Sequence, residues 1–247
     1  EMCDSDWSSD VCSSDLGIAL LGVVLAAPAG AEPRAYAGLE AGYTTGDFGT
    51  GQRSDLYSLY AHGGVVAADW DLGATLPLHV LRTEGEDSEA GPGDLVLRAG
   101  HTLIPTTRGG LSLYGSAALK LPTGDERAGL STGEADAGGF LFLRQRWDGY
   151  RGRLYLGHTW VGDPPGSDYN DTTTLGAQGF ARAGAAWLYA GAERRTALLD
   201  ANDHPVELFA GGFGPWGRKR AITAETFVGL TDGGPDLGLR LGFIHWY

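Results

Sequence analysis

Cysteine is almost absent from this sequence: two of the 247 residues are cysteines. Both of them, Cys3 and Cys12, lie within the first 15 residues. An exported chain that keeps neither cysteine cannot depend on disulfide bonds. A chain of this size must then be stabilised by a large hydrogen-bonded architecture.

Positive charge is also scarce. Eighteen lysine and arginine residues stand against 31 aspartate and glutamate residues, which gives a net charge of −13. Nucleic acids select proteins with basic patches, so we expect no nucleic-acid partner. Glycine is abundant, with 41 residues, but the many leucine, valine and aromatic residues argue against a disordered chain.

Long apolar runs are missing, apart from one near the N-terminus. Residues 16–27, LGIALLGVVLAA, are too few for a membrane-spanning helix but have the length of a signal-peptide core. Ala29-Gly30-Ala31 then forms an A-x-A cleavage site before Glu32. We therefore predict a signal peptide over residues 16–31.

The first 15 residues do not fit a signal peptide, which should begin with a positively charged region. They read EMCDSDWSSDVCSSD, with five acidic residues and no lysine or arginine. The string SSDVCSSDL resembles translated sequencing-adapter DNA, so we expect residues 1–15 to be non-biological. The exported chain would then be one domain over residues 32–247, with 26 acidic residues and a net charge of −8.

Helical periodicity is hard to find, whereas alternation at every second residue recurs along the chain. In LSLYGSAALKL, residues 111–121, the four leucines share one face, while Tyr114 and Lys120 share the other. The same alternation predicts twelve strands, near 35–44, 55–65, 69–82, 93–104, 110–121, 135–147, 152–162, 171–182, 185–196, 205–213, 220–231 and 236–247.

The connections between these strands alternate in length. Those after odd-numbered strands are long and polar, such as RTEGEDSEAGPGD, while those after even-numbered strands are mostly short, such as DGYRG. Short turns at one rim, longer loops at the other and an even strand number are typical of bacterial outer-membrane barrels. We therefore predict an all-β fold: an antiparallel, up-and-down transmembrane β-barrel of about 12 strands in the bacterial outer membrane.

A closed barrel also explains the composition and the last residues. Lipid-facing and interior side chains alternate, so a mean hydropathy of only −0.14 is compatible with a membrane protein. Aromatic residues fall near the predicted rims: Trp70, Trp147, Trp216, Trp246 and Tyr247 at the short-turn rim, with Tyr43 and Trp160 at the other.

The last strand, 236–247, must pair with the first to close such a barrel. Its aromatic residues Phe243 and Tyr247 resemble the C-terminal signal that the outer-membrane insertion machinery reads. The alternative is an edge strand of a secreted β-sandwich, which would not predict the alternation of loop lengths.

One segment resembles a known family. LKLPTGDERAGLSTGEADAG, residues 119–138, is similar to the KLPTG…GTG…D segment of outer-membrane proteins of the MetA-pathway phenol-degradation family, with LSTG in place of the usual LGTG. The resemblance covers one hairpin loop. It implies a barrel of about twelve strands that passes small, aromatic compounds, and it assigns no catalytic or binding residue.

The charged residues on the predicted interior face are the candidate site. Five basic residues lie on the fourth to seventh strands: Arg98, Lys120, Arg144, Arg146 and Arg153. Three acidic residues lie on the ninth to eleventh strands, and the first and last strands add one charge each: Glu193, Glu207, Glu225, Glu40 and Arg240. A basic arc opposite an acidic arc would create a field across the interior. The alternative is that these charges pair and fill a narrow barrel.

Motifs for other functions are missing. The acidic loop residues lack EF-hand spacing, so we expect no specific metal site and no cofactor. His101 and His158 are each followed by a threonine, but adjacent strand residues point to opposite faces, and the other histidines, His79 among them, have no serine partner in sequence. GxSxG, HExxH and phosphate-loop patterns do not occur, so we expect no enzyme.

The sequence thus predicts a monomeric barrel that acts as a passive channel for small molecules. Its partners would be outer-membrane lipid, lipopolysaccharide, the barrel-assembly machinery and a small solute. Two alternatives stay open: a barrel of the envelope with no transport role, and an outer-membrane lipid hydrolase.

Overall fold

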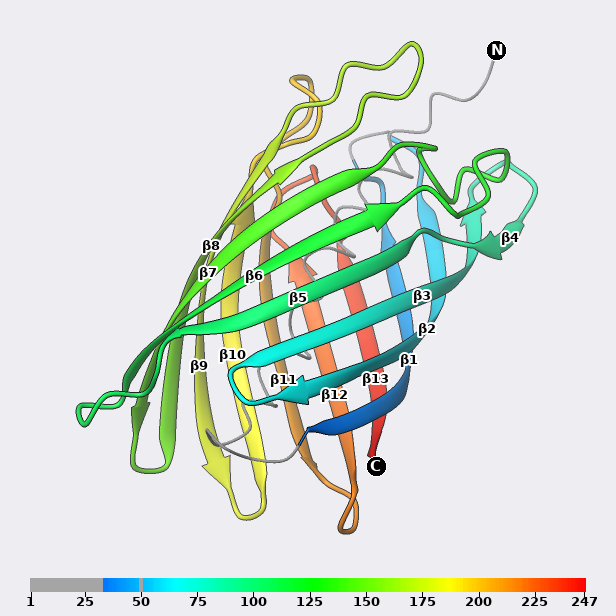
Figure 1. Cartoon of the computed structure of the whole chain (residues 1–247). Helices are drawn as coiled ribbons and strands as arrows, with labels where there is room; N and C mark the ends of the chain where they lie inside the picture. Colours follow the sequence, from blue (N-terminus) through cyan, green and yellow to red (C-terminus); the bar gives the residue numbers. More distant parts are fainter. Residues whose placement is uncertain (1–32, 49–50) are drawn as a thin grey trace.

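The chain forms one antiparallel sheet that closes on itself (Figure 1). The computed structural model describes residues 33–48 and 51–247, so the predicted adapter-derived and signal segments lie outside the described residues. The strands are β1 (Arg34–Gly46), β2 (Ser54–Ala67), β3 (Trp70–Thr83), β4 (Glu89–Pro92), β5 (Leu95–Ile104), β6 (Leu111–Leu121), β7 (Asp136–Trp147), β8 (Tyr150–Trp160), β9 (Thr172–Ala183), β10 (Ala186–Arg195), β11 (Val206–Pro215), β12 (Arg220–Gly229) and β13 (Leu237–Trp246).

The ring closes between β1 and β13. Their register runs from Tyr36 opposite Trp246 to Thr45 opposite Leu237, while the other edge of β1 pairs with β2. A strand bonded on both edges leaves no backbone groups open to lipid. The predicted closed barrel of twelve strands and the pairing of the last strand with the first are therefore confirmed.

One strand was not predicted. β4 pairs with Leu78–Leu81 of β3, and β5 pairs with Trp70–Thr75 of the same strand. β4 and β5 are thus two halves of one wall strand, broken at Gly93 and Asp94. Pro77 lies on β3 opposite the break, where a proline has no N–H to give to a ladder.

The connections sort by length as predicted. The end of the barrel with the long connections, which we call the loop end, carries residues 47–53, 84–94, 122–135, 161–171, 196–205 and 230–236. The opposite end, the turn end, carries 68–69, 105–110, 148–149, 184–185 and 216–219. Figure 1 shows the longest loops at the top of the view and the short turns at the bottom.

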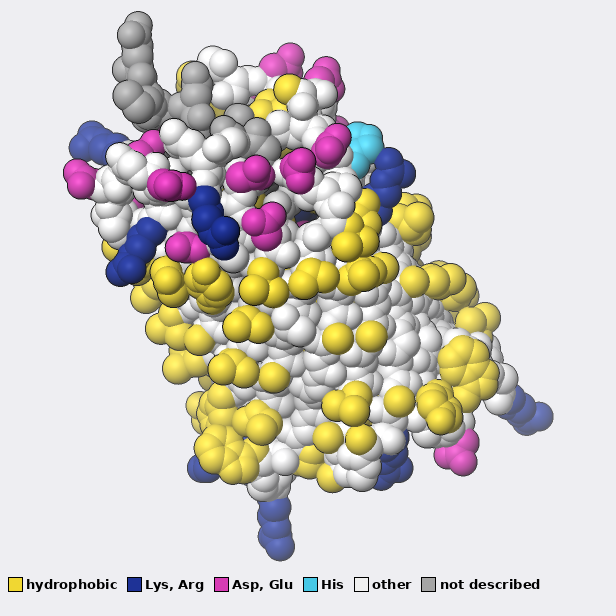
Figure 2. Space-filling view, turned by 180° about the vertical axis from the view of Figure 1, so that it is seen from behind, with side chains coloured by type: hydrophobic (Ala, Val, Ile, Leu, Met, Phe, Trp, Pro, Cys, Tyr) yellow, Lys and Arg dark blue, Asp and Glu magenta, His cyan; other side chains and the backbone are white. Residues whose placement is uncertain are grey.

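The outer surface is a belt of exposed leucines. Leu111 is 42% exposed and Leu241 is 65% exposed, so neither is hidden between two layers of a sandwich. Figure 2 shows apolar side chains over the body of the barrel, with acidic side chains gathered at the loop end. Water-soluble proteins rarely expose apolar surface on this scale, so the belt identifies a barrel that spans an outer membrane.

Aromatic residues border the belt at both ends. Trp70, Trp147 and Trp216 are exposed at the turn end, and Trp160 is exposed at the loop end, as predicted for membrane interfaces. Trp246 does not belong to this border. It lies at the turn end, as predicted, but its ring packs inside the barrel against Tyr36. Within the described residues, no helix is long and apolar enough to cross a membrane.

Candidate functional site: the inner wall of the barrel

The side chains opposite the leucine belt line the interior of the barrel. Arg240 of β13 lies beside Glu225 of β12, with 3.4 Å between Arg240 Nη1 and Glu225 Oε1. The Tyr189 hydroxyl donates to the other oxygen of Glu225 at 2.9 Å. Glu40 is 5% exposed on the neighbouring strand β1. The structure thus brings Glu40, Glu225 and Arg240 together on one side of the interior.

Two further glutamates extend this acidic side. Glu193 of β10 and Glu207 of β11 are direct cross-strand partners. The Tyr155 hydroxyl donates to Glu193 Oε2 at 2.6 Å. Arg195, also on β10, lies close enough to act on the charge of Glu207. On the inward face of β10 to β13 and β1, four glutamates therefore stand against three arginines: Arg34, Arg195 and Arg240.

Arg98 forms an ion pair with Asp71 on the neighbouring strand. Its Nη2 atom lies 3.5 Å from Asp71 Oδ1, and the Tyr114 hydroxyl donates to the other oxygen of Asp71. Arg98 is therefore part of a local polar cluster on β3, β5 and β6, and it adds little free positive charge to the interior.

Lys120 faces inward but does not line an open surface. Its side chain is 1% exposed, and Nζ lies 2.8 Å from Asp136 and 3.5 Å from Asp94. Thr132 accepts a further hydrogen bond from it at 3.0 Å. The alternation places Lys120 inside, but the loop 122–135 covers it and Asp94 and Asp136 balance its charge, so it stabilises that loop.

The remaining predicted basic residues carry no ion pair among the described residues. Arg144 lies 4.1 Å above the ring of Tyr114. Arg153 lies 5.3 Å from the ring of Phe142 and also contacts Tyr155 and Phe180. Arg146 is exposed near the turn end of β7. The basic arc therefore consists mainly of arginines on β7 and β8.

The prediction from charged residues missed the aromatic part of the inner wall. Thirteen inward-facing residues of the described chain make up what we call the aromatic wall: Tyr36, Tyr60, Tyr114, Phe140, Phe142, Tyr155, Phe180, Trp187, Tyr189, Phe209, Phe213, Phe227 and Trp246. They occupy the same alternate positions as the charged residues, so the strand pattern could have revealed them.

Many of these rings lie flat against a glycine of the next strand. A Cβ atom at Gly157 would collide with the Phe140 ring, and one at Gly176 would collide with the Tyr155 ring. The same relation links Gly238 to Phe227. These glycines let the rings cover the wall instead of projecting across the interior.

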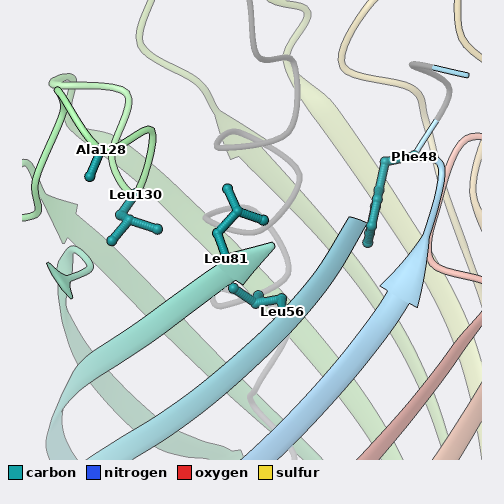
Figure 3. Packing of buried hydrophobic residues seen from close by; sticks show 5 residues of the cluster. All are labelled: Phe48, Leu56, Leu81, Ala128 and Leu130. Atoms are coloured by element: carbon teal, nitrogen blue, oxygen red, sulfur yellow. The ribbon is translucent and has the colours of Figure 1, made fainter. Parts of the chain in front are cut away.

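Apolar residues also gather at the loop end. Phe48, Leu56, Leu81, Ala128 and Leu130 are buried together, with Leu56 and Leu81 paired across β2 and β3. Figure 3 shows Ala128 and Leu130 reaching this group from the loop 122–135. This cluster packs Phe48 and the loop 122–135 against the loop-end halves of β2 and β3.

Register also gives two histidines partners that the sequence could not show. Ser58 and His79 are cross-strand partners, with 2.8 Å between Oγ and Nδ1, and His79 is 2% exposed. The prediction that His79 lacks a serine partner was therefore wrong. On the outer surface, His158 Nδ1 lies 3.1 Å from Thr173 Oγ1, and its Nε2 lies 3.6 Å from Asp171.

The sequence matches no protein-family model and no curated protein. Solved structures do match. An outer membrane channel from Pseudomonas putida F1, described as COG4313, is similar with a TM-score of 0.73 and 14% identity, covering 89% of this chain and 97% of that one. The shared fold is that of an outer-membrane β-barrel.

Two other barrels are similar at a lower level. The translocator domain of the autotransporter NalP from Neisseria meningitidis has a TM-score of 0.54 and 14% identity, covering 96% of this chain and 95% of that one. The KdgM porin has a TM-score of 0.52 and 10% identity, covering 84% of this chain and 98% of that one. These likenesses confirm the outer-membrane barrel fold and leave function to be argued from the inner wall.

Proposed function

We propose that this chain is a passive channel of the outer membrane for small organic molecules, with aromatic compounds as its preferred solutes. The observation that carries the proposal is the aromatic wall, in which rings and charged side chains alternate around the interior. An interior that served only to fill space would not need buried arginines and glutamates among those rings. The channel of similar fold and the KLPTG resemblance support the same function.

The charged arcs would orient a solute during passage. Glu40, Glu193, Glu207, Glu225 and Arg240 form the acidic side, while Arg144, Arg146 and Arg153 form the basic side. Opposed arcs set up a transverse field that orders water and favours polar or dipolar groups, while the rings hold apolar parts. Arg98 and Lys120 are held by local ion pairs and contribute less to this field.

Flux into liposomes tests the proposal. Liposomes with the purified chain should take up benzyl alcohol and small phenols faster than protein-free liposomes, and faster than they take up a sugar of similar size. Uptake no faster than in protein-free liposomes would contradict a channel and favour a barrel without a transport role.

A surface hydrolase is the second candidate, because Thr173, His158 and Asp171 stand in series on the outer face at the loop end. A hydroxyl, an imidazole and a carboxylate in that order can activate a nucleophile. Release of fatty acid from lipid A or phospholipid by the purified chain, lost on His158→Asn, would support this function. Turnover equal to that of the variant would exclude it.

A further inference from the structure

The hairpin β7–β8 carries two successive cross-strand pairs of arginines. Arg144 lies opposite Arg153, and Arg146 lies opposite Arg151. All four share the inward face of the hairpin, and we call them the arginine ladder. Like charges directly opposite each other destabilise a sheet, so two such pairs in a row work against the fold.

No carboxylate of the described residues lies within ion-pair distance of the arginine ladder. Among the residues that the structure describes, none of the four arginines makes an ion pair, whereas Arg98, Lys120 and Arg240 all do. Glu193 and Glu225 act on Arg153, and Asp71 acts on Arg144, from beyond ion-pair distance. At the turn end, Arg182 of β9 adds further positive charge beside Arg151.

Several guanidinium donors of the ladder are buried without an acceptor. Arg153 is 5% exposed, and only its Nη2 atom finds a partner, in Gln178. Its Nε and Nη1 atoms have none, and the Nε atoms of Arg144 and Arg151 are also buried and unpaired. Buried donors without acceptors are costly, and an arginine offers them in a fixed fork that matches a carboxylate.

Aromatic rings surround the same donors. The guanidinium of Arg144 lies over Tyr114, and that of Arg151 lies 3.9 Å from the ring of Trp187. Phe142, Tyr155 and Phe180 surround Arg153. The rings stabilise the cations, but they leave the in-plane N–H groups free to bind another partner.

We propose that the arginine ladder binds an organic anion whose carboxylate is attached to a flat apolar ring. The carboxylate would accept hydrogen bonds from Arg144 and Arg153, and its ring would enter beside Phe142, Tyr155 and Phe180, which must move apart to admit it because none is more than 7% exposed. The site rests on the proposed channel function and defines its solute class as aromatic carboxylates. These solutes would bind at the arginine ladder, in the turn-end half of the interior, on their way through the channel.

Titration calorimetry of the full chain in detergent tests the site with three probes. Benzoate carries both the ring and the charge, benzyl alcohol lacks the charge, and cyclohexanecarboxylate lacks the aromatic ring. Benzoate should bind saturably and more tightly than either of the others. The double variant Arg144→Gln, Arg153→Gln should bind benzoate about tenfold more weakly, or worse. The matched control, Arg218→Gln with Arg220→Gln, removes the same charge from exposed positions in the turn 216–219 and at the start of β12, and should leave affinity unchanged.

Two further readouts separate binding from a structural role. Arg153→Lys keeps the positive charge but loses the planar guanidinium, which can donate two parallel hydrogen bonds to a carboxylate. It should therefore weaken benzoate binding while the net charge stays the same. Removing the like-charge pair should raise the unfolding temperature of the double variant. A double variant that is less stable than the parent chain would assign the arginines to structure and overturn the site.

Benzoate that does not saturate the parent chain, or binds the double variant equally well, would also overturn the site. The result of the liposome flux experiment is independent of the result of this binding experiment. Saturable benzoate binding without flux would contradict the proposed channel and support the anion site. Flux of benzyl alcohol without saturable benzoate binding would support the channel and contradict the anion site.

Discussion

At the residue scale, glycines decide how the aromatic wall is built. The ring of Tyr155 lies over Gly176, and its hydroxyl reaches Glu193 across the strand between them. A side chain at Gly176 would push the ring into the interior and break that hydrogen bond. The relation depends on strand register, so the sequence indicated the inward positions but not which ring covers which glycine.

Gly176→Ala should destabilise the barrel by roughly 1–3 kcal/mol, because the new methyl group overpacks the wall under Tyr155. Urea unfolding of the chain in lipid vesicles would measure it. Gly179→Ala is the control on the same strand, since no neighbouring atom lies within 4 Å of its Cβ position. Equal stability of the two variants would show that Tyr155 does not need the glycine.

The buried Lys120 cluster makes a second prediction at this scale. Lys120→Met would leave Asp94 and Asp136 buried without their shared cation, which should cost about 3–5 kcal/mol. Urea unfolding should show this loss, and Lys219→Met in the exposed turn should show almost none. A small effect at Lys120 would mean that the two carboxylates are solvated in the folded chain.

At the scale of elements, the break between β4 and β5 explains the KLPTG segment. Gly124 donates to Asp94 Oδ1 at 2.9 Å, Thr123 accepts from Leu95 at 2.9 Å, and Asp125 donates to Pro92 at 3.0 Å. The loop therefore fills the wall where the strand is interrupted. The sequence predicted that the strand 110–121 ends just before this loop, but the partner segment is some 30 residues away in sequence, and only the register shows it.

The twelve long strands could be predicted because each one alternates over enough residues to fill a membrane span. β4 could not, because Glu89–Pro92 is four residues long and lies in an acidic, glycine-rich loop. The pairings of His79 with Ser58 and of His158 with Thr173 were hidden for another reason: partners on different strands meet only when the register is known.

The end of β13 should matter for assembly. Tyr247 is 68% exposed at the turn end, where an insertion signal would be read. We expect Tyr247→Ala to lower the amount of assembled barrel in outer membranes several-fold, measured by heat-modifiable migration on gels. Tyr150→Ala, which removes a ring that is 62% exposed at the same end, is the control. Equal losses in both variants would point to the membrane interface rather than to a signal.

At the scale of the whole molecule, one alternation sorts every strand into a lipid face and an interior face. Leucines occupy the first, and rings, glycines and charges occupy the second. Closure by β1 and β13 makes this possible, since it leaves no strand edge in the membrane. The belt, the aromatic wall and the arginine ladder all depend on this one arrangement.

Nitroxide labels placed one at a time along β13, in a chain with Cys3 and Cys12 replaced by serine, test that arrangement most directly. In liposomes, labels at Leu237, Leu239, Leu241 and Phe243 should be accessible to lipid-dissolved oxygen, and labels at the inward-facing positions Arg240, Ile244 and Trp246 should not. Accessibility should therefore alternate at every second residue. Accessibility that does not alternate, or leucine positions shielded from oxygen, would contradict a closed barrel in the membrane.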